Sequence, residues 1–342
     1  MSQAISPSST ENLTRKDFVT SNDVRWCPGC GDYAILNAMQ RTFAELGVPR
    51  EKFVVVSGIG CSSRFPYYMN TYGFHTIHGR APTVATGVKV ANPDLSVWVI
   101  TGDGDGLSIG GNHLMHMLRR NVNVKVLLFN NRIYGLTKGQ YSPTSPTGLK
   151  TKSTPMGSID HPINPLLFAL GAESTFVART VDTNVKHMSE VFKAAHEHEG
   201  AAFIEVLQNC VIFNDGTWDP VASKENRDNQ LLYLNDGEPL RFGPEQSKGL
   251  RMKGFDPEVV DLNEEPEAEL IHHDPEANGI NYAQLLAHMS YPQFPTPMGV
   301  IWRTQRATYE SLIHGQVAEA QNRPGRKPLQ DLLNGSETWQ VS

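Results

Sequence analysis

Short apolar runs rich in β-branched residues recur along the chain, and stretches with helical periodicity separate them. Runs that are apolar at every position are typical of parallel strands covered on both faces. The pattern predicts strands at Phe53–Ser57, Val97–Thr101, Val124–Phe129, Phe176–Ala178 and Ala202–Leu207. It predicts helices at Tyr33–Leu46, Thr83–Ala91, Leu107–Arg120, Pro165–Leu170 and Val185–His198, with Asp32 as the cap of the first. We therefore expect an α/β fold, with a mainly parallel sheet and helices on both of its faces.

The pattern is regular only in part of the chain. Residues 1–20 are rich in Ser and Thr and are expected to form a loose arm, whereas 21–217 holds the predicted α/β domain. From 218 to 304 the elements become short and polar, which indicates a C-terminal appendage rather than a second full domain. Residues 305–342 are expected to form a polar tail with one helix, at Tyr309–Asn322.

Glycine-rich and polar turns follow two of the predicted strands. The turn at 102–106 (GDGDG) comes directly after one strand, and Asn130-Asn131 ends the next. Residues 105 to 129, 25 in number, are enough for one helix and one strand, so both turns should lie at the same edge of the sheet. A carboxylate and an amide at this edge can hold one small divalent cation, with a diphosphate completing its shell. The long segment Tyr141–Asp160 that follows suggests a functional loop such as a lid.

The four cysteines form a second candidate site. Cys27 and Cys30 flank Pro-Gly in a Cys-x-x-Cys turn, and Cys61 and Cys210 each follow a predicted strand. These two single cysteines should therefore also lie at the carboxyl edge of the sheet. Four thiolates can complete either one tetrahedral zinc site or one iron–sulfur cluster. The spacing, with no second close pair, favours [4Fe–4S] over zinc, and both remain open on this ground.

Single basic residues near these turns are candidates for substrate or cofactor contacts. His78 lies in a His-Gly-Arg turn, and Arg64 and Lys138 each follow a candidate cofactor loop. Fixed positive charges of this kind suit a substrate carboxylate, although solvation at the surface is the ordinary role of a lone Arg or Lys. His113 and His116 lie on a methionine-rich helix and are interpreted as packed or surface residues.

Composition excludes several classes of protein. The formal net charge of the 342 residues is -6, with no basic stripe, which argues against nucleic acid as the main partner. No apolar run approaches the roughly 20 residues that span a bilayer, so no membrane is expected. The N-terminal residues lack the apolar core of a secretory signal, and we expect a cytoplasmic protein whose cysteines stay reduced.

The motifs together carry a family resemblance. The sequence GDG, residues 105–129 and then Asn130-Asn131 resemble the thiamine-diphosphate fingerprint. The stretches WCPGCG (26–31), GIGCSSR (58–64), HGR (78–80) and NNRIYGLTKGQYSPTS (130–145), in this order, resemble the β subunit of the 2-oxoacid:ferredoxin oxidoreductases, most closely the 2-oxoglutarate member. The resemblance covers roughly residues 20–300.

The resemblance implies cofactors and roles for the matching positions. Cys27, Cys30, Cys61 and Cys210 would hold a [4Fe–4S] cluster, and Asp103, Asn131 and the carbonyl of Ile133 would bind Mg²⁺. Thiamine diphosphate would contact the backbone of Gly104, Asp105, Gly135 and Leu136 and, on its thiamine side, Ile59, Gly60, Cys61, Ser62 and His78. Arg64 and Lys138 would meet the acidic end of the substrate, and a lysine at 138 favours a dicarboxylate.

The resemblance also implies a reaction and partners. The reaction would be oxidative decarboxylation of 2-oxoglutarate to succinyl-CoA and CO₂, with electrons passing through the cluster to ferredoxin. Because we find no second α/β module, the glutamate that activates thiamine diphosphate should come from an α subunit, in an αβ or α2β2 assembly. The alternatives are an oxidoreductase for pyruvate or for a broad range of 2-oxoacids, a non-redox thiamine enzyme with structural zinc, and a non-catalytic electron-transfer subunit.

Overall fold

The computed structural model describes residues 13–325, 327–339 and 341. The strands are β1 (Phe53–Ser57), β2 (Tyr72–His75), β3 (Ser96–Gly102), β4 (Val124–Asn130), β5 (Phe176–Val181), β6 (Ala202–Leu207), β7 (Leu231–Tyr233), β8 (Arg241–Phe242), β9 (Lys248–Lys253), β10 (Asp256–Asp261) and β11 (Thr296–Arg303). The helices are α1 (Asp32–Glu45), α2 (Phe65–Tyr68), α3 (Ala81–Ala91), α4 (Asp103–Leu107), α5 (Gly111–Arg119), α6 (Pro165–Gly171), α7 (Val185–Glu197), α8 (Asp219–Ala222), α9 (Arg227–Gln230), α10 (Asn281–His288), α11 (Tyr309–Asn322) and α12 (Leu329–Asn334). Short 3₁₀ turns, η1 to η4, lie at Arg15–Phe18, Arg50–Lys52, Ser62–Arg64 and Pro244–Gln246.

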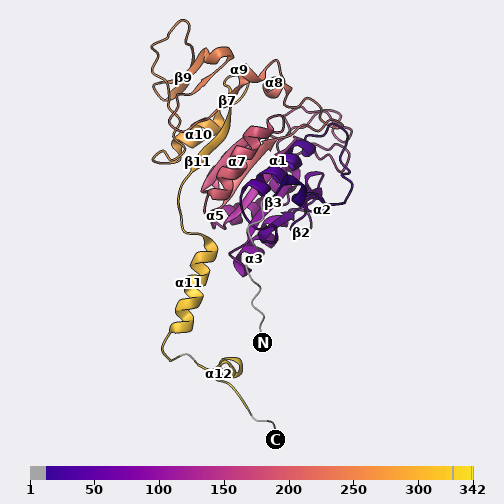
Figure 1. Ribbon diagram of the computed structural model, residues 1–342, viewed down its shortest axis with the longest axis vertical. Coiled ribbons are helices and arrows are strands. Elements are labelled where there is room, and N and C mark those ends of the chain that lie inside the picture. The colour runs from indigo at the N-terminus through magenta and orange to yellow at the C-terminus, as the bar shows by residue number, and fades with distance from the viewer. Residues whose placement is uncertain (1–12, 326, 340, 342) are drawn as a thin grey trace.

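One eight-stranded sheet organises the molecule, in the order β2-β1-β3-β4-β6-β5-β11-β7. The six strands from β2 to β5 are mutually parallel, and β11 pairs antiparallel with β5 and parallel with β7. The carboxyl ends of β1, β3, β4 and β6 therefore lie side by side at one edge. A second, antiparallel sheet of β10, β9 and β8 stands beyond the main one (Figure 1).

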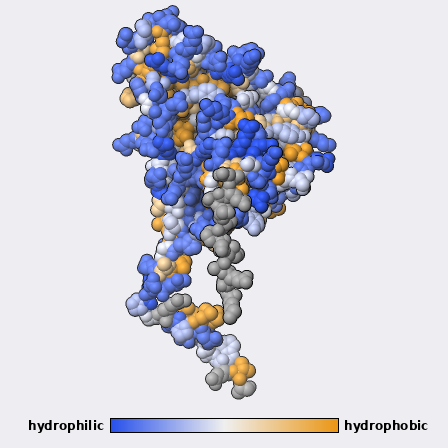
Figure 2. Space-filling view, in the orientation of Figure 1, coloured by the Kyte–Doolittle hydropathy of each residue, from blue (hydrophilic) through white to orange (hydrophobic). Residues whose placement is uncertain are grey.

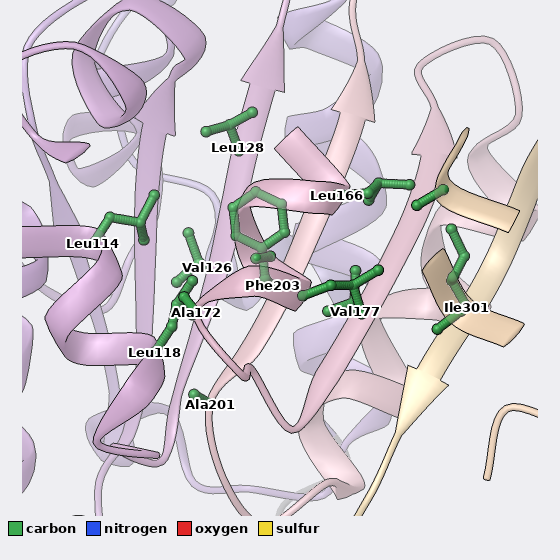
Figure 3. Close-up of a cluster of buried hydrophobic side chains, with 14 of the residues drawn as sticks. Leu114, Leu118, Val126, Leu128, Leu166, Ala172, Val177, Ala201, Phe203 and Ile301 are labelled. Carbon is green, nitrogen blue, oxygen red and sulfur yellow. The ribbon is translucent and has the colours of Figure 1, made fainter. Parts of the chain in front are cut away.

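Helices cover both faces of the main sheet, as the sequence pattern predicted. Alternate residues of each strand pack to opposite sides, with Val97 and Val99 in one core and Trp98 and Ile100 in the other. The first core lies under α3, α5, α6 and α10, and Figure 3 shows its centre, where Phe203 of β6 meets Leu166, Ala172 and Val126. The second core lies under α1 and α7. Because both faces are covered, nearly every position of the central strands is buried and most are apolar, which contributes about 1.5–3 kcal/mol for each large apolar side chain.

The N-terminal region differs from the expectation in two places. Residues 13–20 are not a loose arm, because Phe18 of η1 is fully buried against Phe43 and Phe53; the rest of the expected arm, 1–12, lies outside the described residues. Asp32 does not cap α1, since Gly31 occupies the N-cap position and makes no side-chain cap. Asp32 is instead buried beside the cysteines, and its side chain takes part in that site.

The segment expected as a C-terminal appendage contributes directly to the main sheet. Its strands β7 and β11 extend the sheet beyond β5, while β8 to β10 form the small outer sheet. The tail contains helix α11 at the predicted bounds and a further short helix, α12, and both project away from the main body (Figure 1).

The surface on the side shown in Figure 2 is mostly hydrophilic over the main body. Exposed apolar side chains recur along α12, at Leu329, Leu332 and Leu333. None of the helices in the described part of the chain combines the length and the apolar character that crossing a membrane requires.

Candidate functional site at the carboxyl edge of the sheet

The loops that follow β1, β2, β3 and β4 line one cavity of about 80 Å³. Its wall contains every residue assigned above to thiamine diphosphate or Mg²⁺, together with Gly102, Tyr134 and Thr137. The assigned residues in the wall are Ile59, Gly60, Cys61, Ser62, His78, Asp103, Gly104, Asp105, Asn131, Ile133, Gly135 and Leu136. They come from stretches up to about 80 residues apart in sequence, and parallel strand pairing brings them together.

The turn expected at 102–106 is largely helical, because Asp103–Leu107 form the short helix α4, and the helix expected at Leu107–Arg120 begins only at Gly111, as α5. Asp103 stands at the first position of α4, with a side chain that is 1 % exposed. Ser142 Oγ and Thr144 Oγ1 donate hydrogen bonds to Asp103 Oδ2 at 2.5 and 2.6 Å. Burial raises the pKa of Asp103 to about 6, and the two hydroxyl donors act against this rise.

The donor set around Asp103 fits a hard cation. Asn131 and Ile133 line the same cavity, so a carboxylate, an amide oxygen and a main-chain carbonyl are available. Oxygen ligands of these kinds are the ones that Mg²⁺ prefers. Neither donor to Asp103 carries a charge, so the buried carboxylate has no positive partner in these two hydroxyl groups. A bound cation would balance its negative charge.

Asp105 ties two loops of the site to the strand β3. Its Oδ1 accepts hydrogen bonds from the backbone N–H of Ile59 at 3.2 Å and of Gly79 at 2.8 Å, and its Oδ2 accepts one from Thr101 Oγ1 at 2.6 Å. His78 Nδ1 lies 2.5 Å from Asp105 Oδ1. A Cβ atom on Gly58 would lie 1.8 Å from Asp105 Oδ2, so only glycine fits there. The carboxylate therefore fixes the positions of the loops that carry the other residues.

Tyr134 covers Gly104 on the wall of the cavity. Its hydroxyl donates to the carbonyl of Gly104 at 2.8 Å, and a Cβ atom on that glycine would lie 2.3 Å from the ring. Gly104 has to lack a side chain so that the ring can pack here. This contact fixes the loop after β4 to the start of α4.

The two members of the Asn130-Asn131 pair have different surroundings. Asn131 lines the cavity, whereas the buried Asn130 donates to Glu205 Oε1 at 2.7 Å and accepts from Thr144 Oγ1 at 2.9 Å. Glu205 in turn accepts from Arg179 Nε at 2.6 Å. A network of buried polar groups thus runs from Arg179 to Thr144, which also holds Asp103.

The four cysteines are free thiols that meet at the same edge. A Cβ atom on Gly135 would lie 3.5 Å from Cys61 Sγ and 3.6 Å from Cys210 Sγ, so both sulfur atoms adjoin the wall of the cavity. Burial raises the pKa of the Cys30 and Cys61 thiols, that of Cys61 to about 12, and the neighbouring carboxylate of Asp32 adds to both shifts. Iron bound to the sulfur would offset this cost of forming thiolates.

Among the described residues, no three or more His, Cys, Asp or Glu side chains are arranged so that they could hold one metal ion. A [4Fe–4S] cluster binds each thiolate to a different iron atom, and its ligands surround a larger volume than those of a single ion. The choice between a cluster and zinc stays a prediction from the sequence.

Arg64 and Lys138 lie on the loops of the site but not in the wall of the cavity. Arg64 Nε donates to Tyr68 OH at 2.9 Å. Lys138 is exposed and adopts a left-handed backbone conformation, with φ of 75°. The structure therefore places both cations near the cavity without bringing them into it.

Three residues of the site were not singled out from the sequence: Tyr134, Ser142 and Thr144. All three lie within the stretch 130–145 that carried the family resemblance. Hydroxyl side chains in a loop have no spacing signal of their own, so the motif was the only sign that could have identified them.

Comparisons with known proteins agree with this geometry. The family described as "Thiamine pyrophosphate enzyme, C-terminal TPP binding domain" matches residues 58–206. The 2-oxoglutarate oxidoreductase subunit KorB of Mycobacterium tuberculosis is 52% identical over 98% of this chain and 90% of its own length. The β subunit of 2-oxoacid:ferredoxin oxidoreductase 2 of Aeropyrum pernix is 50% identical over 67% of this chain and 74% of its own length.

A solved structure is similar over nearly the whole chain. It is a 2-oxoglutarate:ferredoxin oxidoreductase from Magnetococcus marinus with 2-oxoglutarate, coenzyme A and succinyl-CoA bound. The TM-score is 0.77 at 35% sequence identity, covering 96% of this chain and 97% of that chain.

The fold and the cavity at its carboxyl edge define a thiamine-diphosphate-binding domain of the diphosphate-binding type. Within that class, the chain belongs to the family of 2-oxoacid:ferredoxin oxidoreductase β subunits, as the resemblance implied. It is therefore a subunit of an oxidoreductase.

Proposed function

We propose that this chain is the β subunit of a CoA-acylating 2-oxoglutarate:ferredoxin oxidoreductase, with thiamine diphosphate, Mg²⁺ and one [4Fe–4S] cluster. The observation that carries the proposal is the single cavity whose wall holds all twelve assigned cofactor residues and adjoins the sulfur atoms of Cys61 and Cys210. The relatives named for 2-oxoglutarate support the choice of substrate.

Residues of this chain would hold the diphosphate end of the cofactor. Asp103, Asn131 and the carbonyl of Ile133 provide oxygen ligands for Mg²⁺, and the backbone of Gly104, Asp105, Gly135 and Leu136 approaches the phosphates. When bound, thiamine diphosphate supplies the electron sink that decarboxylation of a 2-oxoacid requires. Asp105 keeps the backbone N–H groups of Ile59 and Gly79 in place, so the wall of the site is formed before the cofactor enters.

The cluster would be held by Cys27, Cys30, Cys61 and Cys210. Cys61 belongs both to this set and to the cavity wall, so the cluster would lie beside the cofactor. This position supports an electron-transfer role for the cluster in the reaction, with ferredoxin as the final acceptor. A protein with such thiolates would function in the reducing cytoplasm.

A partner α subunit would complete the site. The cavity of about 80 Å³ is small beside the roughly 300–1,000 Å³ that is typical of ligand pockets, so most of the surface around a bound cofactor must come from another source. We propose that the α subunit supplies it, together with the activating glutamate and much of the coenzyme A site. Arg64 and Lys138 would then meet the distal carboxylate of 2-oxoglutarate in the assembled complex.

The test begins with anaerobic purification of the complex that forms on this chain, followed by analysis of iron, sulfide and thiamine diphosphate. We expect all three, and loss of thiamine diphosphate in Asp103→Ala but not in the control Asp331→Ala, which changes an exposed carboxylate of the tail. A colourless, iron-free complex would contradict the cluster. The chain without its partner should not reduce viologen with 2-oxoglutarate, and turnover by the isolated chain would contradict the role of the α subunit.

Substrate choice is tested separately, because several relatives are named for 2-oxoacids in general. Neutral substitutions Lys138→Met and Arg64→Met should lower kcat/KM for 2-oxoglutarate more than for pyruvate. An equal loss with both substrates would favour an enzyme with a broad range of 2-oxoacids.

A further inference from the structure

Gln208 lies between β6 and Cys210, with a side chain that is only 1 % exposed. Its Nε2 donates a hydrogen bond to Cys30 Sγ at 3.3 Å and another to the carbonyl of Asn209 at 2.6 Å. A carbonyl oxygen can only accept, so the second bond fixes which end of the amide faces the sulfur. The N–H end points at Cys30.

The other end of this amide is unusual. Gln208 Oε1 is buried and has no hydrogen-bond partner in the described part of the chain. A buried, unpaired carbonyl oxygen costs about 1–3 kcal/mol, and an apolar side chain of the same length would avoid this cost. This cost is offset if the N–H end makes a favourable hydrogen bond that an apolar side chain cannot make.

The surrounding backbone holds Gln208 in this position. Gly31 N donates to the carbonyl of Asn209 at 3.3 Å, which joins the Cys27–Cys30 turn to the Cys210 loop. Asn209 N donates to Asp182 Oδ2 at 2.8 Å. A Cβ atom on Gly31 would lie 1.9 Å from Asp182 Oδ2, so the two loops pack too closely for any side chain at this position. The amide is therefore presented to Cys30 by a rigid frame.

We propose that Gln208 is a positioning residue that raises the reduction potential of the [4Fe–4S] cluster through its N–H···S hydrogen bond to the Cys30 thiolate. This inference rests on the proposed function, which assigns Cys30 to the cluster. Hydrogen bonds to ligand sulfur are one of the means by which proteins set the potential of such clusters. One-electron reduction adds negative charge that spreads onto the sulfur ligands, and an N–H donor stabilises the reduced cluster more than the oxidised one.

The local charges make such a donor useful. Asp32 is buried beside Cys30 and Cys61, and in its ionised form it would oppose the entry of an electron. No basic side chain donates a hydrogen bond to Cys30 among the described residues. Gln208 thus provides a neutral N–H donor to the sulfur of Cys30, which lies beside Asp32.

The experiment is a redox titration of the intact complex, followed by electron paramagnetic resonance of the reduced cluster. Gln208→Met keeps the length of the side chain and removes the N–H donor, and it should shift the midpoint potential to a more negative value. Gln208→Glu keeps the shape and replaces the donor by a carboxylate, so it should shift the potential further in the same direction. Gln330→Met, on exposed helix α12, is the matched control and should leave the potential unchanged.

Iron and sulfide are measured in every variant. These measurements distinguish a failure of the proposed function from a failure of the role proposed for Gln208. A wild-type complex without a cluster would overturn the proposed function. A wild-type cluster with an unchanged potential in Gln208→Met would overturn only the role of Gln208. If Gln208→Met loses the cluster, Gln208→Glu decides; loss of the cluster in both variants would assign Gln208 a purely structural role and overturn the proposal.

Discussion

Asp105 shows how one buried side chain can organise a site by holding the backbone of neighbouring segments. Its carboxylate accepts from backbone N–H groups on two different loops and from the hydroxyl of Thr101 on β3. These two loops carry residues of the cavity wall, Ile59 and His78. The hydrogen bonds of Asp105 therefore hold much of the cavity wall in place.

Replacing Asp105 by alanine should destabilise the protein. The change leaves the N–H groups of Ile59 and Gly79 and the hydroxyl of Thr101 without their acceptor, and we expect a loss of about 2–4 kcal/mol in the free energy of unfolding. Urea unfolding followed by circular dichroism measures it. The control Asp94→Ala changes an exposed carboxylate, and a loss below about 0.5 kcal/mol in Asp105→Ala would contradict the role as a tie between loops.

His198 should make the protein sensitive to acid. It is buried, next to the hydroxyl of Thr175, and burial lowers the pKa of His198 from 6.5 to about 4. Between these values the unfolded chain binds a proton that the folded chain does not, so this group reduces stability as the pH falls from about 6.5 to 4. At pH 5 the effect is about 2 kcal/mol.

The measurement compares urea midpoints at pH 7.5 and pH 5 for the wild type and His198→Asn. The wild type should lose more stability than the variant over this interval, because asparagine does not titrate. The comparison with the variant is needed because burial also raises the pKa of Asp103 and Asp182 to about 6, and these groups act with the opposite sign. Equal losses in both proteins would contradict the prediction.

Residue roles were predictable from the sequence only where a motif marked them. Asp103, Cys61 and Cys210 follow strands, and Cys27 and Cys30 form a Cys-x-x-Cys turn, so sequence position alone marked all five. Ser142 and Thr144 could not be identified this way, because their role depends on a loop that folds back over 39 and 41 positions to reach Asp103. The role of Gln208 could not be predicted either, because its partner Cys30 lies 178 positions away in the sequence.

Among the elements, α4 shows how a glycine-rich stretch is shaped by its neighbours. The sequence GDGDG favours a turn, yet the structure has a helical turn there. Tyr134 packs on Gly104, and Thr101 binds Asp105, so tertiary contacts outweigh the weak helix propensity of glycine.

Substituting Gly104 by alanine tests this packing. The new methyl group would lie 2.3 Å from the ring of Tyr134, which must move and lose its hydrogen bond to the Gly104 carbonyl. We expect a loss of about 1–3 kcal/mol in stability and weaker binding of thiamine diphosphate, measured by urea unfolding and isothermal titration calorimetry of the complex. Gly102→Ala is the matched control, because its methyl group would meet only Ser62 Oγ at 3.6 Å; equal effects would contradict the argument.

Strand prediction succeeded where both faces of the sheet are covered and failed at its far edge. β1 and β6 have the predicted bounds, since a mainly apolar run is typical of a doubly covered parallel strand. β11 was not predicted, because Pro297 and Gly299 interrupt its pattern. It joins the sheet through antiparallel pairing with β5, a contact between positions more than 100 residues apart that local sequence does not encode.

At the scale of the whole molecule, the C-terminal tail is attached to the body at its first turns. Glu310 of α11 is buried, and its Oε2 accepts from Asn123 N at 3.3 Å. The buried Asn121 donates to the carbonyls of Arg306 and Ala307, and His314 contacts the carbonyl of Val90 at 2.9 Å. The side chains described after Arg323 are exposed.

Two truncations should therefore differ in effect. Ending the chain after Arg323 removes α12 and should change the free energy of unfolding by less than about 0.5 kcal/mol, because surface residues contribute little. Ending it after Thr304 also removes Glu310, whose charge raises the pKa of the buried Lys89 and Lys125 against the effect of burial. Without this carboxylate, the two buried ammonium groups lose a nearby negative charge. We expect the free energy of unfolding to fall by about 2–4 kcal/mol.

The single substitution Glu310→Gln separates charge from the rest of the tail. It keeps the length of the side chain and the whole of α11, and it should reproduce a large part of the loss caused by ending the chain after Thr304. Glu319→Gln, on the exposed surface of the same helix, should have no measurable effect on the urea midpoint. A stable Glu310→Gln protein alongside an unstable truncation would show that the hydrogen bonds from Asn121 to the tail and between His314 and Val90, rather than the buried carboxylate, attach the tail to the body.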